Sequence, residues 1–298
     1  MKPKELPMSK TFRPYFLPGD HNNPNDPIRT LQIAAAGKHP ILVLNPTACP
    51  VQALAKQIVK MLPDFSKREI KELIQIYTSP NEIPHKRPVV TITPDVHHGS
   101  LIGGGRLPEP GLLSIAHTGI LILKDINQFQ EPTLATIRDV LKEGEVTLSR
   151  ANQIRHIPAA PILLATISDS ALNPASTFPH FSLVQNQPQT EHFSNLDKGK
   201  YAVAKAREIQ LKRYGNTITT NANMKPEQLA THCQLRPQQL KLLMRTAQNG
   251  NNPKKDFDKQ IWLARTIADL AGCPTIEADH LREAMRGYFL YLHLVGQP

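Results

Sequence analysis

Three short runs of apolar residues stand out along the chain, at Ile41–Leu44, Ile120–Leu123 and Ile162–Ile167. Each run is bounded by polar or turn-forming residues, which is typical of a strand that is buried on both faces. Between the runs, the segments 51–62 and 133–141 carry apolar residues at helical spacing. The alternation of strand and helix predicts an α/β fold with a parallel, doubly wound sheet flanked by helices.

The remaining pattern predicts how the chain is organised around this sheet. Residues 1–26 are rich in proline, asparagine and charge, and they predict a disordered or extended arm. The α/β core is expected over 27–175, and the polar composition of 176–197 predicts a linker. Over 198–298 nearly every segment has apolar residues at helical spacing, so we expect a small, all-helical lid domain there.

Two smaller features complete the prediction for the core. Apolar residues over 28–36 indicate a short helix that ends at Gly37, because glycine is a frequent helix stop. The segment 145–158 has the pattern of two short strands joined by a polar turn. That pattern predicts a β-hairpin.

Composition limits the classes of protein to which the chain can belong. The 298 residues carry a net charge of +10, spread along the chain, and this favours an anionic partner such as DNA. Cys49, Cys233 and Cys273 lack metal-ligand spacing, so we expect reduced thiols in a cytoplasmic protein. No segment has the roughly 20 apolar residues that span a bilayer, so no membrane partner is expected.

Five blocks of sequence resemble, in order, one known family, the magnesium-chelatase-like AAA+ ATPases of the ComM and YifB type. The resemblance extends over residues 27–290, and none of it corresponds to the Lon-like N-terminal domain of that family. Five blocks in the family's order make the combination specific. The matching blocks are LQIAAAGKHPILVL, HHGSLIGGGRLPEPGLLSIAHTGILIL, TLATIRDVLKEGEVTLSRA, WLARTIADLAG and EADHLREAM.

The resemblance implies a P-loop NTPase core of the AAA+ type, followed by a helical lid. It also implies a hexameric ATPase that uses ATP and Mg²⁺. The alternative functions differ in whether that activity is kept. If it is, the chain is an ATP-dependent motor for DNA branch migration in natural transformation and recombination, with ATP and Mg²⁺ as cofactors.

The phosphate-binding loop of the family corresponds here to the segment after the strand Ile41–Leu44. Such a loop needs glycines for close approach, a lysine for the β- and γ-phosphates and a hydroxyl for Mg²⁺. In this chain Val51 stands at the lysine position and Gln52 at the hydroxyl position, while Pro50 removes a backbone N–H that would face phosphate. The degenerate loop consists of Asn45, Pro46, Thr47, Ala48, Cys49, Pro50, Val51 and Gln52.

The second nucleotide motif falls at the end of the strand Ile120–Leu123. In the family an Asp there positions Mg²⁺ and the Glu that follows polarises the attacking water. Without gaps, Lys124 takes the Asp position and Asp125 the catalytic Glu position. If the register shifts so that Asp125 is the metal ligand, Ile126 takes the catalytic position. An ammonium cannot hold a divalent cation, so one role is lost under either alignment.

Other nucleotide-sensing positions also differ from the family. Ser168 stands where an asparagine senses the γ-phosphate, and Lys255 replaces a sensing arginine without offering the bidentate fork of a guanidinium. No arginine occurs between His156 and Ala206, so the family's candidate arginine finger has no counterpart. An arginine finger contributes about 10³–10⁵ in rate, and its loss argues against an active ATPase.

Basic residues on the predicted hairpin are the candidate nucleic-acid contacts. Related ATPases direct such hairpins at a central pore, where Arg150, Arg155 and His156 would contact DNA phosphates without reading sequence. The alternative is that these side chains are only solvated, since no aromatic platform accompanies them. His97 and His98 have no acid or cysteine at ligand spacing, so we expect them to pack within their loop and expect no metal site.

Three hypotheses for the function follow. In the first, the chain is a pseudoenzyme that keeps the fold, needs no cofactor, and binds DNA or an active homologous subunit or forms a homo-oligomer. In the second it is an active ATP-driven DNA motor, and in the third it is a remnant that only folds. Val51 and Lys124 favour the first and third over the second, because they remove the charges that handle triphosphate and Mg²⁺.

Overall fold

A five-stranded sheet lies at the centre of the protein, and all its strands are parallel. The computed structural model describes residues 27–44, 51–77, 79–105, 109–150, 153–168, 181, 183–186, 196–215, 220–247 and 253–285. The order across the sheet is β2-β5-β8-β1-β9. The five strands are β1 (Ile41–Leu44), β2 (Val89–Ile92), β5 (Ile120–Leu123), β8 (Ile162–Ile167) and β9 (Leu183–Asn186).

The three predicted strands form the middle of this sheet, and the α/β fold class is confirmed. β1, β5 and β8 have the predicted bounds, and every residue in them is buried. β2 and β9 at the two ends lie outside the predictions. β9 falls within 176–197, where we expected a linker, and it pairs with β1 so that Val184 lies opposite Leu42. Backbone hydrogen bonding to β1 thus forms a strand within this mainly polar segment, and the division into domains stays a prediction.

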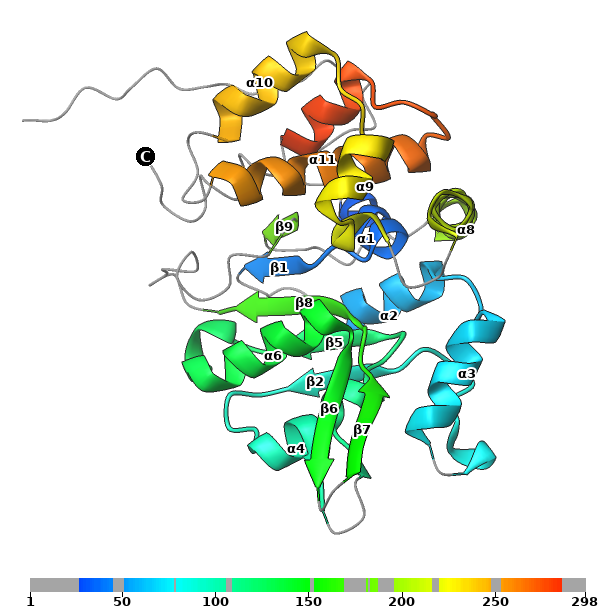
Figure 1. The fold of residues 1–298 in the computed structure, drawn as a ribbon, viewed down its shortest axis with the longest axis vertical. Helices are drawn as coiled ribbons and strands as arrows, with labels where there is room; N and C mark the ends of the chain where they lie inside the picture. The colour runs from blue at the N-terminus through cyan, green and yellow to red at the C-terminus, as the bar shows by residue number, and fades with distance from the viewer. Residues whose placement is uncertain are drawn as a thin grey trace, which may run out of the picture.

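Helices cover both faces of the sheet (Figure 1). The predicted hairpin is present as β6 (Glu145–Arg150) and β7 (Gln153–Pro158), an antiparallel pair that projects away from the C-terminal helices (Figure 1). A second, short antiparallel pair is formed by β3 (Gly103–Gly104) and β4 (Glu109–Pro110). The helices of the N-terminal, α/β part of the chain are α1 (Pro27–Gly37), α2 (Val51–Met61), α3 (Lys67–Ile76), α4 (His98–Ile102), α5 (Leu112–Ile115) and α6 (Glu131–Glu143). The same part has the 3₁₀ turns η1 (Pro80–Glu82) and η2 (Ile126–Gln128).

The C-terminal part of the chain is helical, as predicted from its periodicity. Within the described ranges, none of its helices is long and apolar enough to cross a membrane. Residues 278–285 are also helical. The other C-terminal elements are α8 (Leu196–Tyr214), the 3₁₀ turn η3 (Asn221–Asn223), α9 (Pro226–His232), α10 (Pro237–Ala247) and α11 (Pro253–Leu270).

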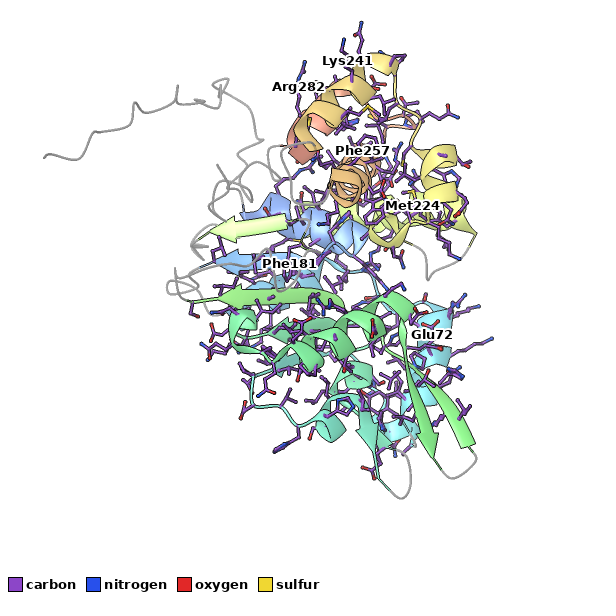
Figure 2. The ribbon with its side chains drawn as sticks, turned by 60° about the vertical axis from the view of Figure 1, so that its left-hand side comes forward. Glu72, Phe181, Met224, Lys241, Phe257 and Arg282 are labelled. Atoms are coloured by element: carbon purple, nitrogen blue, oxygen red, sulfur yellow. The ribbon has the colours of Figure 1, made fainter. Side chains whose placement is uncertain are left out.

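Alternate residues of β1, β2, β5 and β8 face two separate apolar clusters. Ile41 and Val43 of β1 belong to the cluster that also contains residues of α1, α2, α8 and α11. Leu42 and Leu44 face the other cluster, together with residues of α3, α5 and α6 and with Phe181, which Figure 2 shows at the level of the sheet. The first cluster continues without a break from the sheet into the C-terminal helices. The two expected domains therefore share one core.

The end of α1 explains how these parts come so close together. The helix ends at Gly37, as predicted, but the left-handed residue is Lys38, with φ of 58°. A Cβ on Gly37 would lie 2.5 Å from the ring of His39 and 2.6 Å from Oγ1 of Thr266 on α11. Glycine is therefore needed here for close packing of α1 against α11, while Lys38 makes the turn.

A buried set of polar side chains, here called the polar junction, connects α8, η3 and α11. Asp269, which is 1% exposed, lies at its centre. Its carboxylate accepts hydrogen bonds from Arg213 at 2.7 Å, from Asn221 at 2.8 Å and from Arg265 at 3.1 Å. Thr266 Oγ1 donates to the Trp262 carbonyl at 3.0 Å, and the ring of His39 bonds to the same hydroxyl at 2.7 Å. The junction thus connects the start of β1 to the C-terminal helices.

Candidate functional site

The carboxyl edge of the sheet brings together three of the predicted positions, Lys124, Asp125 and Ser168. In Figure 1 the arrows of β1 and β8 point to the left, so this edge is the left side of the molecule. Lys124 and Asp125 directly follow β5, and Ser168 directly follows β8. β8 lies between β5 and β1, which places these strand ends beside the carboxyl end of β1 at Leu44. In open α/β sheets, ligands bind at this edge, where connections leave to opposite sides of the sheet.

Asp125 is held in place from β8. Its backbone is left-handed, with φ of 55° and ψ of 61°, a conformation that Asp tolerates better than most residues. The Asp125 N–H donates to Oγ1 of Thr166 at 2.9 Å, and the hydroxyl of Ser168 donates to the Asp125 carboxylate. The Gln128 N–H also donates to the Asp125 carbonyl at 2.9 Å. The carboxylate that aligns with the catalytic Glu is therefore engaged by a neighbouring strand.

Lys124 continues the edge of the sheet but contributes a positive charge to it. Its N–H donates to the Ile92 carbonyl at 3.0 Å, and its side chain is exposed. Carboxylates and water are the ligands that Mg²⁺ takes, and an ammonium repels the ion. Within the described parts of the chain, no group of three His, Cys, Asp or Glu side chains is placed to hold a metal ion.

The phosphate-loop positions are only partly described. Residues 45–50 lie outside the described ranges, so the predictions for Asn45 to Pro50 stay predictions. Val51 and Gln52 form the first turn of α2. Val51 is half-buried and packs against the apolar core, whereas Gln52 is exposed. The side chain at the lysine position therefore contributes to packing.

The structure describes the side chain of Ser168 but not that of Lys255. Ser168 is exposed at the carboxyl edge and contacts Asp125. Lys255 belongs to the first turn of α11, but its side chain lies outside the described residues. Sequence reasoning missed Thr166, which is 1% exposed and holds the Asp125 backbone. The signal was a hydroxyl in the otherwise apolar run Ile162–Ile167.

The three residues predicted to contact DNA lie in different surroundings on the hairpin. Arg155 is half-buried, and its Nη2 donates to the Gln75 carbonyl of α3 at 2.8 Å, so this guanidinium attaches the hairpin to the core. His156 is exposed, and its Nδ1 lies 2.7 Å from a Glu145 carboxylate oxygen. The backbone of Arg150 ends β6, but its side chain lies outside the described residues, as do the tip residues 151–152.

Two further results concern residues near this edge and the hairpin. Ile154 of β7 is a 67% exposed apolar side chain, which sequence reasoning did not single out. His97 and His98 are both exposed at the start of α4, so the expectation that they pack within their loop is wrong. They project from the N-terminus of a five-residue helix, where side chains have few neighbours.

Two protein-family models match the chain. A family model described as magnesium chelatase, subunit ChlI, matches residues 21–197, and one described as magnesium chelatase, subunit ChlI C-terminal, matches residues 197–287. The competence protein ComM of Haemophilus influenzae is 28% identical over 308 residues, which cover 90% of this chain and 58% of ComM. The uncharacterized protein YifB of Escherichia coli is 28% identical over 298 residues, which cover 86% of this chain and 57% of YifB.

The chain thus spans just over half the length of these relatives. The two family models follow one another along the chain, and they meet at residue 197. The sheet of parallel strands between helices and the C-terminal helices agree with the AAA+ architecture expected for these matches. The chain therefore belongs to the magnesium chelatase subunit ChlI family and is of the ComM and YifB type.

Proposed function

We propose that this chain is a non-hydrolysing member of its family, a pseudo-ATPase that acts by binding DNA or an active homologous subunit. The observation that carries the proposal is the end of β5. Lys124 presents an ammonium where the family has its metal ligand, and the Asp125 carboxylate accepts a hydrogen bond from Ser168. A site of this kind does not assemble a Mg²⁺–triphosphate complex around a polarised water.

The side chain at the lysine position supports the same conclusion. The lysine of a phosphate loop reaches the β- and γ-phosphates with its ammonium. Val51 has no charge, and its side chain packs against the apolar core instead of extending toward a ligand. The charges that contact phosphate and metal in an ATPase are thus absent from positions 51 and 124 of this chain.

Nucleotide binding tests the proposal directly. We expect a fluorescent ATP analogue to bind no tighter than millimolar, with the same affinity in the presence and absence of Mg²⁺, and we expect no phosphate release from ATP. Micromolar, Mg²⁺-dependent binding would overturn the proposal. It would instead favour the alternative function, an ATP-dependent DNA branch-migration motor, for which the Asp125 carboxylate at the end of β5 is the supporting feature.

A restored variant makes the test sharper. The double substitution Val51→Lys and Lys124→Asp returns the two missing charges to their strand ends, while the rest of the sheet is unchanged. If the nucleotide motifs alone were lost, this variant should bind the analogue at least tenfold more tightly with Mg²⁺ than without it. The matched control is Lys142→Asp, which changes the same charge at an exposed position of α6.

DNA binding through the hairpin requires a separate measurement. We expect binding to short duplex and branched DNA that weakens steeply between 50 and 200 mM salt, because phosphate contacts release counterions. Arg150→Ala should weaken it, whereas Lys142→Ala on α6 should not. Arg155→Ala is unsuitable as a first test, since Arg155 also attaches the hairpin to Gln75. Affinity that is independent of salt, or equal in Arg150→Ala and the parent chain, would remove DNA from the proposal.

Subunit binding is the other part of the proposal. The family is oligomeric, and a chain without hydrolysis can still occupy a position in a ring. We expect analytical ultracentrifugation to show either a homo-oligomer or, when an active full-length homologue is added, a mixed assembly. A chain that stays monomeric with the homologue and binds no DNA would leave only a folded remnant.

A further inference from the structure

Helix α3 carries apolar and basic side chains on its outer face, which the proposed function does not use. We call this surface the α3 stripe, and it consists of Lys67, Ile70, Lys71 and Ile74. Their i, i+3, i+4 and i+7 spacing places them on one face of the helix. Ile70 is 42% exposed, Ile74 is 56% exposed, and both lysines are exposed. The stripe therefore faces solvent on α3, which lies at the right of Figure 1 beside β7.

The opposite face of α3 is fixed to the core. Leu73 and Ile76 are each 1% exposed and belong to the second apolar cluster. At the start of the helix the Ser66 hydroxyl accepts from the Glu69 N–H at 3.2 Å, and the Glu69 carboxylate accepts from the Ser66 N–H at 2.8 Å. Arg155 of β7 donates to a carbonyl of the last turn at 2.8 Å. Loose packing of the helix is therefore not the reason that the stripe is exposed.

The two isoleucines of the stripe have no local explanation. Ile forms helices less well than Ala, Glu or Lys, so helix propensity does not favour it at exposed positions. Ile70 and Ile74 stand one turn apart, and their side chains are therefore neighbours on the helix surface. A single exposed apolar side chain is common, but neighbouring ones at i, i+4 spacing are the pattern with which helices contact a partner.

The stripe is positively charged, and its charge is not balanced within α3. Both carboxylates of this helix bind arginines outside the stripe, Glu69 binding Arg87 at 2.8 Å and Glu72 binding Arg68 at 2.9 Å. Figure 2 labels Glu72. Within the parts of the chain that the structure describes, the two lysines of the stripe form no ion pair. Their ammonium groups are thus available to the carboxylates of a partner.

We propose that the α3 stripe binds an amphipathic helix of a partner protein, one that carries acidic side chains beside an apolar row. Lys67 with Lys71 and Ile70 with Ile74 form two adjacent i, i+4 rows. Such rows are the ridges that interdigitate with the ridges of another helix when two helices pack. The apolar row of the partner covers the isoleucines, and its carboxylates lie against the lysines.

Other occupants suit the stripe less well. The same stripe of a second copy would place lysines against lysines, which disfavours association. DNA phosphates would contact the lysines, but a charged backbone gives the isoleucines nothing apolar to pack against. An interfacial helix buries a longer apolar face in a bilayer than two isoleucines provide. The combination of apolar and basic rows therefore selects an acidic helix with an apolar face.

Fluorescence anisotropy with a synthetic peptide tests the proposal. The probe is a labelled helix of about five turns, with leucines at i, i+4 spacing on one face and glutamates on both sides of them. We expect saturable, micromolar binding to the full chain without nucleotide, in about 150 mM salt. A second peptide has the same composition but distributes its leucines around the helix. It should bind about tenfold more weakly, because its charge is unchanged and its apolar row is lost.

Substitutions separate contact with the stripe from general attraction by the net charge of +10. Ile74→Ser should weaken binding about tenfold, because it removes an apolar contact from the interface. Lys71→Glu should weaken it about fivefold, since it brings like charges together. The matched controls are Leu211→Ser on α8, where the leucine is 45% exposed, and Lys142→Glu on α6. Both controls should bind within about twofold of the parent chain.

Several results would overturn the proposal. They are the absence of saturable binding, equal binding of the two peptides, and an equal loss in Ile74→Ser and Leu211→Ser. Binding of duplex DNA or phosphatidylglycerol vesicles that depends on Ile74, without binding of the peptide, would assign the stripe to another class of partner. Ile74 is exposed, so Ile74→Ser should keep the Tm of the parent chain and report on binding alone. The measurement uses neither nucleotide nor the hairpin arginines, so its failure is distinguishable from failure of the proposed function.

Discussion

The carboxyl edge of the sheet and the polar junction are both built from polar side chains, but they differ in how many hydrogen bonds their central carboxylates accept. At the carboxyl edge Lys124 is exposed, and Asp125 is held by a single side-chain donor and a backbone contact. At the junction Asp269 is enclosed by Arg213, Asn221 and Arg265. The comparison teaches that the fully enclosed carboxylate is the one in the C-terminal helices, whereas the carboxylate at the nucleotide-binding edge keeps part of its surface open to solvent.

The largest expected effect is at the junction. Asp269→Asn would leave Arg213 and Arg265 buried without their counter-charge, which costs about 3–5 kcal/mol in the free energy of unfolding. Urea denaturation measures it. The matched control is Asp279→Asn, an exposed carboxylate paired with Arg282, which should cost less than about 1 kcal/mol. Equal effects of the two substitutions would show that the junction is not a stabilising centre.

The junction should also make stability depend on pH. Burial lowers the pKa of His39 to about 3, whereas an unfolded histidine titrates near 6.5. Because the folded pKa is depressed, this contribution is complete above pH 6.5 and is lost as pH falls from there toward 3, by up to about 1.4 kcal/mol per pH unit. His39→Gln should give a shallower dependence over that window. An identical slope in the two chains would contradict this assignment.

A smaller effect is expected at the carboxyl edge. Thr166→Val removes the acceptor of the Asp125 N–H and should cost about 1–2 kcal/mol in the free energy of unfolding, whereas Thr166→Ser should cost much less. Amide hydrogen exchange at Asp125 and Ile126 should quicken in the valine variant alone. Equal stability and equal exchange in both variants would mean that Thr166 does not position the loop.

The smallest effect is expected for Lys124. Its side chain is exposed, so Lys124→Ala should change the free energy of unfolding by less than about 0.5 kcal/mol. A larger loss, measured by the same urea denaturation, would show that the ammonium has a structural role. The contrast between Lys124 and Asp269 would then be weaker than the geometry indicates.

The sequence patterns predicted the three central strands of the sheet better than the two strands at its ends. β1, β5 and β8 are apolar at every position but Thr166, and their pattern predicts burial without any knowledge of their neighbours. β2 is only partly buried, and β9 contains Gln185 and Asn186, so each depends on the adjacent strand for its conformation. Local pattern does not contain that information.

The candidate site shows the same limit. Asp125 and Ser168 each follow a parallel strand, and the carboxyl ends of parallel strands lie at one edge of the sheet. The contact between these two side chains is consistent with that arrangement. The role of Thr166 and the attachment of Arg155 to Gln75 depend on the detailed placement of side chains. Arg265 and Asp269 stand at i, i+4 spacing on α11 and form a fully buried ion pair. Their spacing alone does not reveal what covers the helix.

The apolar cluster shared by the sheet and the C-terminal helices affects how the protein can be divided. A chain cut between β9 and α8 would expose Ile41, Val43 and their neighbours on one fragment and the apolar side of α11 on the other. Each fragment would present a large apolar surface to water, which favours aggregation over independent folding. Truncation is therefore a poor way to isolate an activity from this protein. Single substitutions in the intact chain are the sound approach.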